Sequence, residues 1–444
     1  MTVRTGASRK QIHLAAHFPG VDHATVWADP GSRSPIEFSS FEHLARTAER
    51  GLFDFLLLAE ELRLREHRGR IHDLDVVGRP EPITVLNALA AVTERLGLAA
   101  TVDATFNEPY DLARRLATLD HLSGGRAAWN VVTSSDALTG ENFRPGGFPD
   151  RAGLPDSRLR PSGGTSLTRA AEFVDTTREL WDSWTAQGVS RPFAHRGRHF
   201  DIAGEFGVPR SPQGHPVVIQ ADDSDEGREF AARAADVILT RHGTLEAGRS
   251  FHADVKRRLE RYGRTPDDLK IMSGVAVVLG DTAAEAREKA SEIRRRQVSP
   301  QGAIITLEQI WGTDLSAYDP DGPLPDTDPV PQPAITEGRT RRGDTVAIAE
   351  KWRALSKEKG LSIRQTVIEE GGRQSFVGTP EAVAAELDEF VQRDAADGFV
   401  LVPHLTPGGL DEFVDRVVPL LQERGSFRTA YRGATLRSHL GLSV

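Results

Sequence analysis

Short apolar runs alternate with amphipathic segments along most of the 444 residues. The runs are apolar at nearly every position, which is typical of strands buried on both faces, and the segments between them repeat apolar residues at helical spacing. Strands are predicted at 11–18, 52–60, 96–105, 126–134, 215–224, 236–242, 271–280 and 399–405. Helices are predicted at 40–51, 82–97, 109–125, 226–235, 244–263, 282–296 and 380–398. About eight such repeats favour an α/β fold, a closed (β/α)8 TIM barrel, over an open doubly wound sheet.

Three stretches interrupt this alternation, at approximately 135–165, 191–214 and 296–378. The second reads as a hairpin, and the other two are rich in Gly, Pro, Ser or Asp. We expect one TIM-barrel domain over 1–444 that carries these insertions, since segments inserted after barrel strands lie at the C-terminal rim. The first and third are interpreted as walls or lids of a site, and surface decoration is the alternative.

The net charge of −9 argues against a protein that binds the phosphate backbone of nucleic acid, because such binding requires a concentrated basic face. No apolar run approaches the ~18 residues of a membrane span, and the first residues lack the apolar core of a signal peptide. The absence of cysteine excludes disulfides, thiolate nucleophiles and iron–sulfur clusters. These observations indicate a cytoplasmic enzyme that binds neither nucleic acid nor membrane.

Common catalytic and nucleotide-binding motifs are missing. The chain has no P-loop, no G-x-G-x-x-G after a strand, no G-x-S-x-G elbow and no H-E-x-x-H. His195 and His199 have four-residue spacing, but they alternate with arginines that would repel a metal ion, so no metal site is predicted. Several classes of barrel enzyme remain open at this point.

One strand ends in polar residues that need an explanation. The run "AAWNVVTS" places Asn130, Thr133 and Ser134 at the end of a buried strand, where polar groups cost free energy unless they find partners. In a parallel barrel this end of the strand houses the chemistry. An asparagine offers both a donor and an acceptor there.

Four stretches together resemble one family. They are "FDFLLLAE", "EPYDLARRLATLDHLSGGRAAWNVVTS", "VVIQADDSDEGREFAARAADVILT" and "DGFVLVPHLTPGGLDEFVDRVVPLLQERGSFRTAYRGATLRSHLGL". The chain resembles the bacterial-luciferase-like flavin monooxygenases, in the branch of the nitrilotriacetate, dibenzothiophene-sulfone and long-chain alkane monooxygenases.

The resemblance implies a two-component monooxygenase. Such an enzyme takes reduced FMN (FMNH2) as a co-substrate from a separate NAD(P)H:flavin reductase and uses dioxygen to oxygenate a small organic substrate. It also implies a homodimer or homotetramer. The insertions at 135–165 and 296–378 would determine the substrate, and they carry no recognisable code.

The resemblance assigns a first group of cofactor-binding candidates at the strand ends. Glu60 stands where the family has an aspartate near the flavin ring, and an ion pair with Arg63 or Arg65 is its alternative role. The segment that passes under the ring corresponds to Asp103, Ala104 and Thr105. The family pattern W-N-x-V-T-S is matched by Asn130, Thr133 and Ser134.

A second group departs from the family pattern. Ser224 and Asp225 stand where a helix N-terminus would hold the FMN phosphate, but Asp222 replaces a glycine and Asp223 adds another carboxylate. We expect these carboxylates to turn outward, with Arg228 or Arg241 compensating, since like charges at ~4 Å repel by about 4 kcal/mol. Where the family has a His-x-x-x-Tyr pair that touches the flavin, this chain has Gly163 and Leu167.

Two histidines are the catalytic candidates. His23 matches a family histidine, and His404 follows the last predicted strand. An imidazole titrates near neutral pH and can donate a proton to an oxygenated flavin. His17 is a third candidate because it ends the first strand.

The residues are also compatible with two other functions. Glu60 and Asp103 could form the acid–base pair of a barrel hydrolase or lyase that needs no flavin. The departures at Gly163 and Leu167 also suit a flavin-binding protein without turnover.

Overall fold

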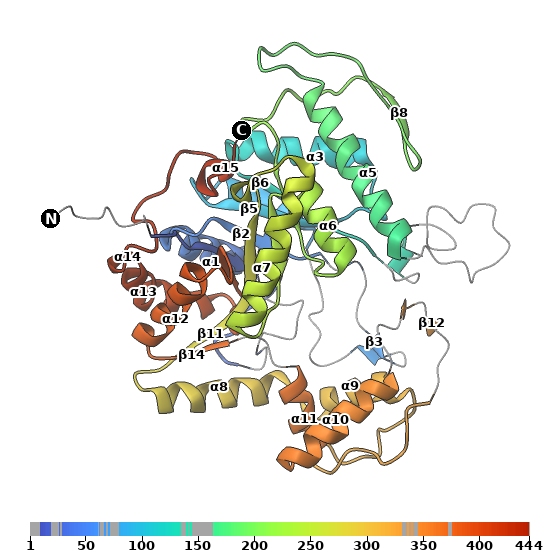
Figure 1. Ribbon diagram of the computed structural model, residues 1–444, viewed down its shortest axis with the longest axis vertical. Helices are drawn as coiled ribbons and strands as arrows, with labels where there is room; N and C mark the ends of the chain where they lie inside the picture. Colours follow the sequence, from blue (N-terminus) through green and yellow to red (C-terminus); the bar gives the residue numbers. More distant parts are fainter. Residues whose placement is uncertain are drawn as a thin grey trace.

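The computed structural model describes residues 9–18, 26, 29–60, 62, 66–67, 70–71, 80–134, 139–140, 142–143, 163–330, 335–336, 339–340, 345–371 and 375–443. Eight parallel strands form a closed barrel that helices surround (Figure 1). They are β1 (His13–His17), β2 (Phe55–Leu58), β5 (Gly97–Asp103), β6 (Ala127–Val132), β9 (Val217–Gln220), β10 (Val237–Thr240), β11 (Lys270–Leu279) and β15 (Gly398–Leu401). Pairing of β10 with β11 closes the ring, so the predicted (β/α)8 fold is confirmed.

Alternate residues of the strands form a core inside the barrel. Phe55, Ala99, Ile219 and Met272 belong to this cluster, together with leucines from the C-terminal segment. That segment contains the short helix α15 (Leu436–His439), and the N–H of Leu436 donates to the carbonyl that precedes β6 by two residues. The C-terminal segment therefore closes the N-terminal end of the barrel, while the other end stays available for a site.

The other face of each strand packs against the surrounding helices, and this larger core includes Leu44, Leu116, Trp129 and Phe173. The helices around the barrel are α1 (Phe38–Arg50), α2 (Pro82–Ala90), α3 (Pro109–Ser123), α5 (Gly163–Asp182), α6 (Asp225–Ala234), α7 (Leu245–Leu259), α8 (Ala283–Gln297), α12 (Pro380–Gln392), α13 (Asp411–Arg416) and α14 (Val418–Glu423). Short 3-10 helices follow α7 and precede α13, namely η2 (Glu260–Tyr262), η3 (Pro266–Asp268) and η4 (Gly408–Leu410).

Helix α2 is shorter than the predicted 82–97. It ends at Ala90, and the Oε1 atom of Glu49 accepts the N–H groups of Glu94, Arg95 and Leu96 at 2.6–2.9 Å. The connection thus satisfies its backbone donors with a side chain from α1 instead of a further helical turn. Gly97 begins β5.

The insertions have partly regular structure. The second contains the predicted hairpin, β7 (Phe193–Arg196) with β8 (Asp201–Gly204). The third contains α9 (Pro300–Trp311), α10 (Thr345–Lys359) and α11 (Ile363–Glu370), which pack around Trp311 and Trp352 and lie to one side of the barrel (Figure 1). Most of the first insertion lies outside the described residues, and a single domain over the whole chain stays a prediction.

A ninth parallel strand was not predicted. β14 (Ser375–Gly378) pairs with Ala276–Leu279, the second half of β11, because this ten-residue strand continues beyond its pairing with β15. Two-residue ribbons pair β3 (Glu66–His67) with β4 (Arg70–Ile71), and β12 (Ile335–Thr336) with β13 (Arg339–Thr340). Among the described residues, no helix has the length and apolarity that crossing a membrane requires.

A buried ionic cluster ties β1, β2 and the C-terminal segment together. Asp54 is fully buried and accepts the N–H of Leu14 at 3.0 Å. Its carboxylate lies 2.7 Å from Arg428 and 3.2 Å from His13. Burial alone would raise the pKa of Asp54, but Arg428 and His13 outweigh it and hold the pKa at about 2. The carboxyl group of Asp54 is therefore ionised in the folded protein at neutral pH.

Replacing this carboxylate should destabilise the protein in a pH-dependent way. Asp54→Asn leaves Arg428 buried without a counter-charge, and the expected loss is about 3–5 kcal/mol at pH 7 by urea unfolding. Because the folded pKa is below that of the unfolded chain, the stabilisation is present above about pH 4 and is lost as pH falls toward 2. The difference between wild type and variant should shrink over that interval. Asp415→Asn, at an exposed partner of Arg50, is the control, and an equal loss there would refute this role.

Candidate functional site

A cavity of about 600 Å³ opens at the C-terminal end of the barrel strands. This volume lies within the range of small-molecule and cofactor pockets. The described residues that line it come from all eight barrel strands, from the loops that follow strands, and from α5 and α6. They are His17, Leu57, Ala59, Glu60, Thr101, Asn130, Val131, Val132, Thr133, Leu167, Ala170, Gln220, Ala221, Asp222, Asp223, Phe230, Leu239, Thr240, Arg241, Gly274, Val400 and Val402.

Three buried oxygen atoms in this lining have no hydrogen-bond partner among the described residues. They are Oδ1 of Asn130, Oε1 of Gln220 and Oγ1 of Thr240. The amide nitrogen of Asn130 donates to Oγ1 of Thr101 at 3.1 Å, so this contact fixes the side chain with its oxygen left over. An unsatisfied buried acceptor costs about 1–3 kcal/mol, which indicates that the cavity is built for a ligand with N–H or O–H donors.

Glu60 is a residue of the lining whose pKa differs clearly from its usual value. Burial, with the nearby carboxylates of Asp103 and Glu81, raises the pKa of Glu60 to about 7, although the N–H of Asp103 donates to its Oε2 at 3.0 Å. Near neutral pH this side chain can therefore hold or release a proton at the cavity wall. Its alternative partners Arg63 and Arg65 lie outside the described residues.

Asp103 and its neighbours form a turn behind the cavity. The carboxylate of Asp103 accepts the N–H groups of Thr105 at 2.6 Å and Phe106 at 3.2 Å, and burial raises its pKa to about 6. Oγ1 of Thr105 accepts the N–H of Ser134 at 3.0 Å. Asp103, Ala104, Thr105 and Ser134 are not among the described residues of the lining. They hold the ends of β5 and β6 together beneath it.

The segment before α6 shows where the flanking carboxylates go. Ser224 is the N-cap of α6, and its Oγ accepts the N–H of Gly227 at 3.0 Å, while Oδ1 of Asp222 accepts the N–H of Ser224 at 2.9 Å. Asp225 points away and pairs with Arg258. We expected Arg228 or Arg241 to neutralise the charge of Asp225, and this expectation was wrong, because Arg258 on α7 is its partner.

The two arginines expected at this segment have different places. Arg228 donates to the carbonyl of Asp223 at 2.9 Å and pairs with Asp254 at 3.3 Å. Arg241 follows β10 and lines the cavity beside Asp222 and Asp223. The expectation that the carboxylates turn outward is therefore corrected, since Asp222 and Asp223 belong to the lining together with Arg241.

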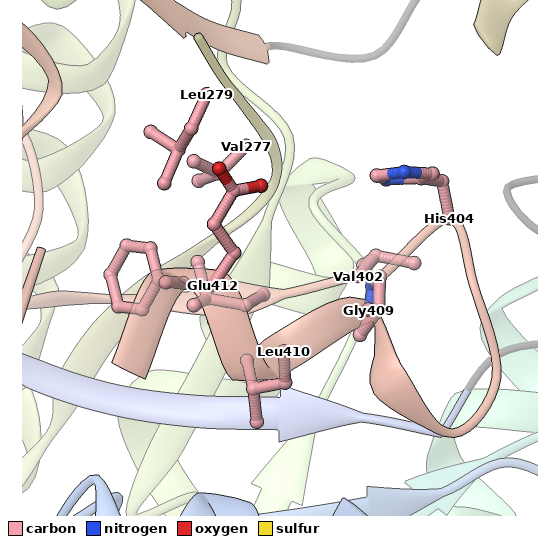
Figure 2. A pocket seen from close by; sticks show the side chains of 10 residues that line it. Val277, Leu279, Val402, His404, Gly409, Leu410 and Glu412 are labelled. Atoms are coloured by element: carbon pink, nitrogen blue, oxygen red, sulfur yellow. The ribbon is translucent and has the colours of Figure 1, made fainter. Parts of the chain in front are cut away.

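His404 lies in a separate small cavity beside Val277, Leu279 and Glu412. Figure 2 shows its imidazole on the loop after β15, next to Val402. Burial, with the nearby Lys289, lowers the pKa of His404 to about 4, so the imidazole is neutral at physiological pH. His404 is not among the described residues that line the large cavity, although Val402 lines both cavities.

The remaining sequence candidates divide between the cavity and undescribed segments. Leu167 on α5 and Thr133 after β6 line the cavity, and Gly163 begins α5. His23 lies outside the described residues. Among the three histidines considered, His17 is the one in the described lining, at the end of β1.

Three residues of the lining were not among the predicted site residues, namely Gln220, Thr240 and Thr101. Gln220 lies in the quoted family stretch, directly after an apolar run, as Asn130 does, and this position was the available signal. Among the described residues, no cluster of three or more histidine or carboxylate side chains is arranged to hold a metal ion.

Comparison with known proteins decides the family. The family model of luciferase-like monooxygenases matches residues 17–398. The chain belongs to the luciferase-like monooxygenases. It is 38% identical to the N-acetyl-S-(2-succino)cysteine monooxygenase of Bacillus subtilis (strain 168) over 458 aligned positions, 98% of each chain. It is 37% identical to nitrilotriacetate monooxygenase component A of Aminobacter aminovorans, over 98% of this chain and 97% of that one.

Solved structures of luciferase-like monooxygenases share the fold. EDTA monooxygenase from Chelativorans sp. BNC1 superposes with a TM-score of 0.76 at 27% identity, over 98% of both chains. DmoA from Hyphomicrobium sulfonivorans superposes with a TM-score of 0.79 at 29% identity, over 97% of this chain and 92% of that one. The resemblance drawn from the sequence is confirmed, and the chain is a flavin-dependent monooxygenase.

The raised pKa of Glu60 has a measurable consequence for stability. In the ligand-free protein, Glu60 favours the folded state below about pH 4.5, and this contribution is lost as pH rises through about 7. Glu60→Gln removes the titration, so the variant should be more stable than wild type by about 2–3 kcal/mol at pH 8.5.

Urea unfolding at pH 4.5 and pH 8.5 checks this, and the gain should be confined to the higher pH. Glu246→Gln, whose side chain is 80% exposed on α7, is the control and should show no such difference. A gain of equal size at both pH values would contradict the titration of Glu60.

Proposed function

We propose that this chain is the oxygenase component of a two-component system. It binds FMNH2 supplied by a separate NAD(P)H:flavin reductase, and it uses dioxygen to oxygenate a small organic substrate. The observation that carries the proposal is the set of three unsatisfied acceptors, on Asn130, Gln220 and Thr240, in a cavity of about 600 Å³. The name "component A" of the relative from Aminobacter aminovorans supports a second, separate component.

The lining fits a reduced flavin in its chemistry. A reduced isoalloxazine presents N–H donors between carbonyl groups, and the free oxygens of Asn130 and Gln220 are acceptors for such donors. The bound cofactor would supply the reaction with dioxygen. The protein's contribution would be to orient the ring and to exclude water from the reacting groups. Apolar side chains of Leu57, Leu239 and Val400 form part of the wall that does so.

Glu60 is the group in the described lining suited to proton transfer. Its pKa of about 7 lets the carboxyl group exist in both forms near neutral pH, as a general acid or base requires. Its Oε2 atom is held by the N–H of Asp103, so the carboxyl group has a fixed position at the wall. The imidazole of His17 also lines the cavity.

The hydrolase or lyase alternative finds no support in this geometry. It requires the carboxyl groups of Glu60 and Asp103 to converge on a substrate, whereas Asp103 accepts two backbone N–H groups of its own turn and is not part of the described lining. A flavin-binding protein without turnover stays as an alternative outcome of the test below. The cytoplasmic location and the homodimer or homotetramer also stay predictions.

Anaerobic titration with photoreduced FMN, followed by mixing with air-saturated buffer, tests the proposal directly. Asn130→Leu should weaken binding of FMNH2 by about 10- to 100-fold, because it removes an acceptor and leaves flavin donors unpaired. The matched control is Gln301→Leu, an amide-to-leucine change at an exposed position of α9, which should bind like wild type.

Two results would count against the function. Absence of FMNH2 binding to wild type would overturn the assignment of the cavity. Tight binding of FMNH2 whose reoxidation follows the course of free FMNH2, with or without organic substrates, would favour the protein without turnover. A transient absorbance that free FMNH2 does not show under the same mixing supports the monooxygenase.

The N-terminus of α6 provides a test specific to the phosphate. Asp222→Gly removes a carboxylate from the lining and releases the N–H of Ser224, which Asp222 now accepts. Its affinity for FMN should rise by about 5- to 10-fold, since one donor is gained and one repulsion is lost. Its affinity for riboflavin, which has no phosphate, should not change. An equal gain for both ligands, measured by fluorescence titration, would place the phosphate elsewhere.

A further inference from the structure

A second cleft, of about 390 Å³, lies at the opposite end of the barrel from the candidate site. It begins beside Asp236, the residue before β10, whereas Thr240 at the other end of β10 lines the candidate site. The described residues that line it are Arg178 on α5, Arg233 and Ala234 on α6, Asp236, Tyr262, Arg264, Asp268, and Arg437, Leu442 and Ser443 of the C-terminal segment.

Two of its four arginines are fully engaged by the fold. Arg437 donates to both carboxylate oxygens of Asp236 at 3.1 and 3.2 Å, and its Nε donates to the carbonyl of Ser443 at 2.6 Å. Arg264 donates to carbonyls at the end of α6, including that of Ala235 at 2.6 Å. These contacts hold two guanidinium groups at fixed positions in the wall.

The other two arginines make fewer described contacts, and Arg233 has one donor without a partner among the described residues. Arg233 pairs through Nη1 with Asp175 at 3.0 Å, while its Nη2 is buried and has no partner among the described residues. Arg178 donates from Nη2 to the carbonyl of Ala234 at 2.6 Å. A buried guanidinium nitrogen without an acceptor costs free energy, and the Arg233 side chain as a whole is 35% exposed.

The lining of the cleft carries more positive than negative side chains. Four arginines face two aspartates, and Asp268 is already the acceptor for the N–H and hydroxyl of Thr265. Burial, together with the neighbouring Arg437, lowers the pKa of Arg178 and of Arg264. Asp175, which lies outside the lining, pairs with Arg233 at 3.0 Å.

We propose that this cleft binds a small oxyanion ligand, one that carries a phosphate or carboxylate group, between Arg178 and Arg233. Guanidinium groups present planar pairs of donors that match both oxyanions. The ligand satisfies the buried nitrogen of Arg233 and offsets the repulsion among the four cations. The site does not depend on the proposed flavin chemistry, and it lies at the other end of the barrel from it.

A purely structural role accounts for only some of these residues. Cations stabilise the C-terminal end of a helix, and Arg264 and Arg178 donate to carbonyls at the end of α6. Arg233 belongs to α6 itself and donates to none of those carbonyls in any contact that the structure describes. Stabilisation of the helix C-terminus therefore does not account for the position of Arg233.

Calorimetric titration with inorganic phosphate and with succinate, against chloride at equal ionic strength, tests the site. Wild type should bind at least one of the two oxyanions, and the ligand that binds identifies the group recognised. Arg233→Gln should weaken binding by about tenfold or more, because it removes a charge-assisted donor. Arg261→Gln is the matched control, since Arg261 pairs with Glu229 nearby and does not line the cleft.

Three results would overturn the proposal. The first is the absence of binding by either oxyanion, and the second is equal affinity in wild type and Arg233→Gln. The third is loss of binding in Arg241→Gln, which would place the anion in the candidate site instead. Arg233→Gln must also keep the far-ultraviolet circular dichroism of wild type, and its FMN affinity should not change.

A last comparison separates a free ligand from the chain itself, because Leu442 and Ser443 line the cleft and residue 444 lies outside the described residues. A variant in which a flexible Gly-Ser tail follows residue 444 carries its terminal carboxylate away from the cleft, and it should bind the oxyanion as wild type does. Binding that occurs only in the extended variant would assign the cleft to a carboxylate of the chain, and it would overturn the proposal of a free ligand.

Discussion

Closure of the parallel barrel is the constraint on which the rest of the structure depends, because it places the carboxyl ends of eight strands around one opening. The ladder between β10 and β11 completes the ring, and it pairs Val237 with Lys270 through to Thr240 with Ser273. An open sheet would leave two edges with unpaired backbone groups and would spread the strand ends along a line. In the closed form, side chains as distant in sequence as His17 and Arg241 line one cavity.

The polar groups of the candidate site lower the stability of the ligand-free protein, and the same groups can bind a ligand. The unsatisfied oxygens of Asn130, Gln220 and Thr240, and a carboxyl group at Glu60 whose charge is disfavoured by burial, all destabilise the ligand-free protein. The buried Asp54 cluster and the apolar core of the barrel stabilise the fold and offset that cost. A ligand with complementary donors recovers it on binding, which is the usual relation between strain and function in enzymes.

Helix α6 connects the two proposed sites through its two ends. Its N-terminus faces the large cavity, where Ser224 and Asp222 already accept two of the backbone N–H groups, and Arg258 from α7 pairs with Asp225. Its C-terminus faces the arginine cleft, where its carbonyls attract guanidinium groups. The helix dipole favours anions at the first end and cations at the second, so the helix orders charge at both ends of the barrel.

The sequence by itself favoured the barrel, because about eight apolar runs of strand length alternate with amphipathic helical segments, and it placed Asn130 at a strand end. It indicated Glu60, but the direction of the Asp103 carboxylate, toward its own turn, was decided by backbone donors that exist only once that turn is formed. The partner of Asp225, the ninth strand and the separate cavity of His404 were likewise decided by tertiary structure. Each depends on residues distant in the chain, and local pattern carries no information about which distant group a side chain will meet.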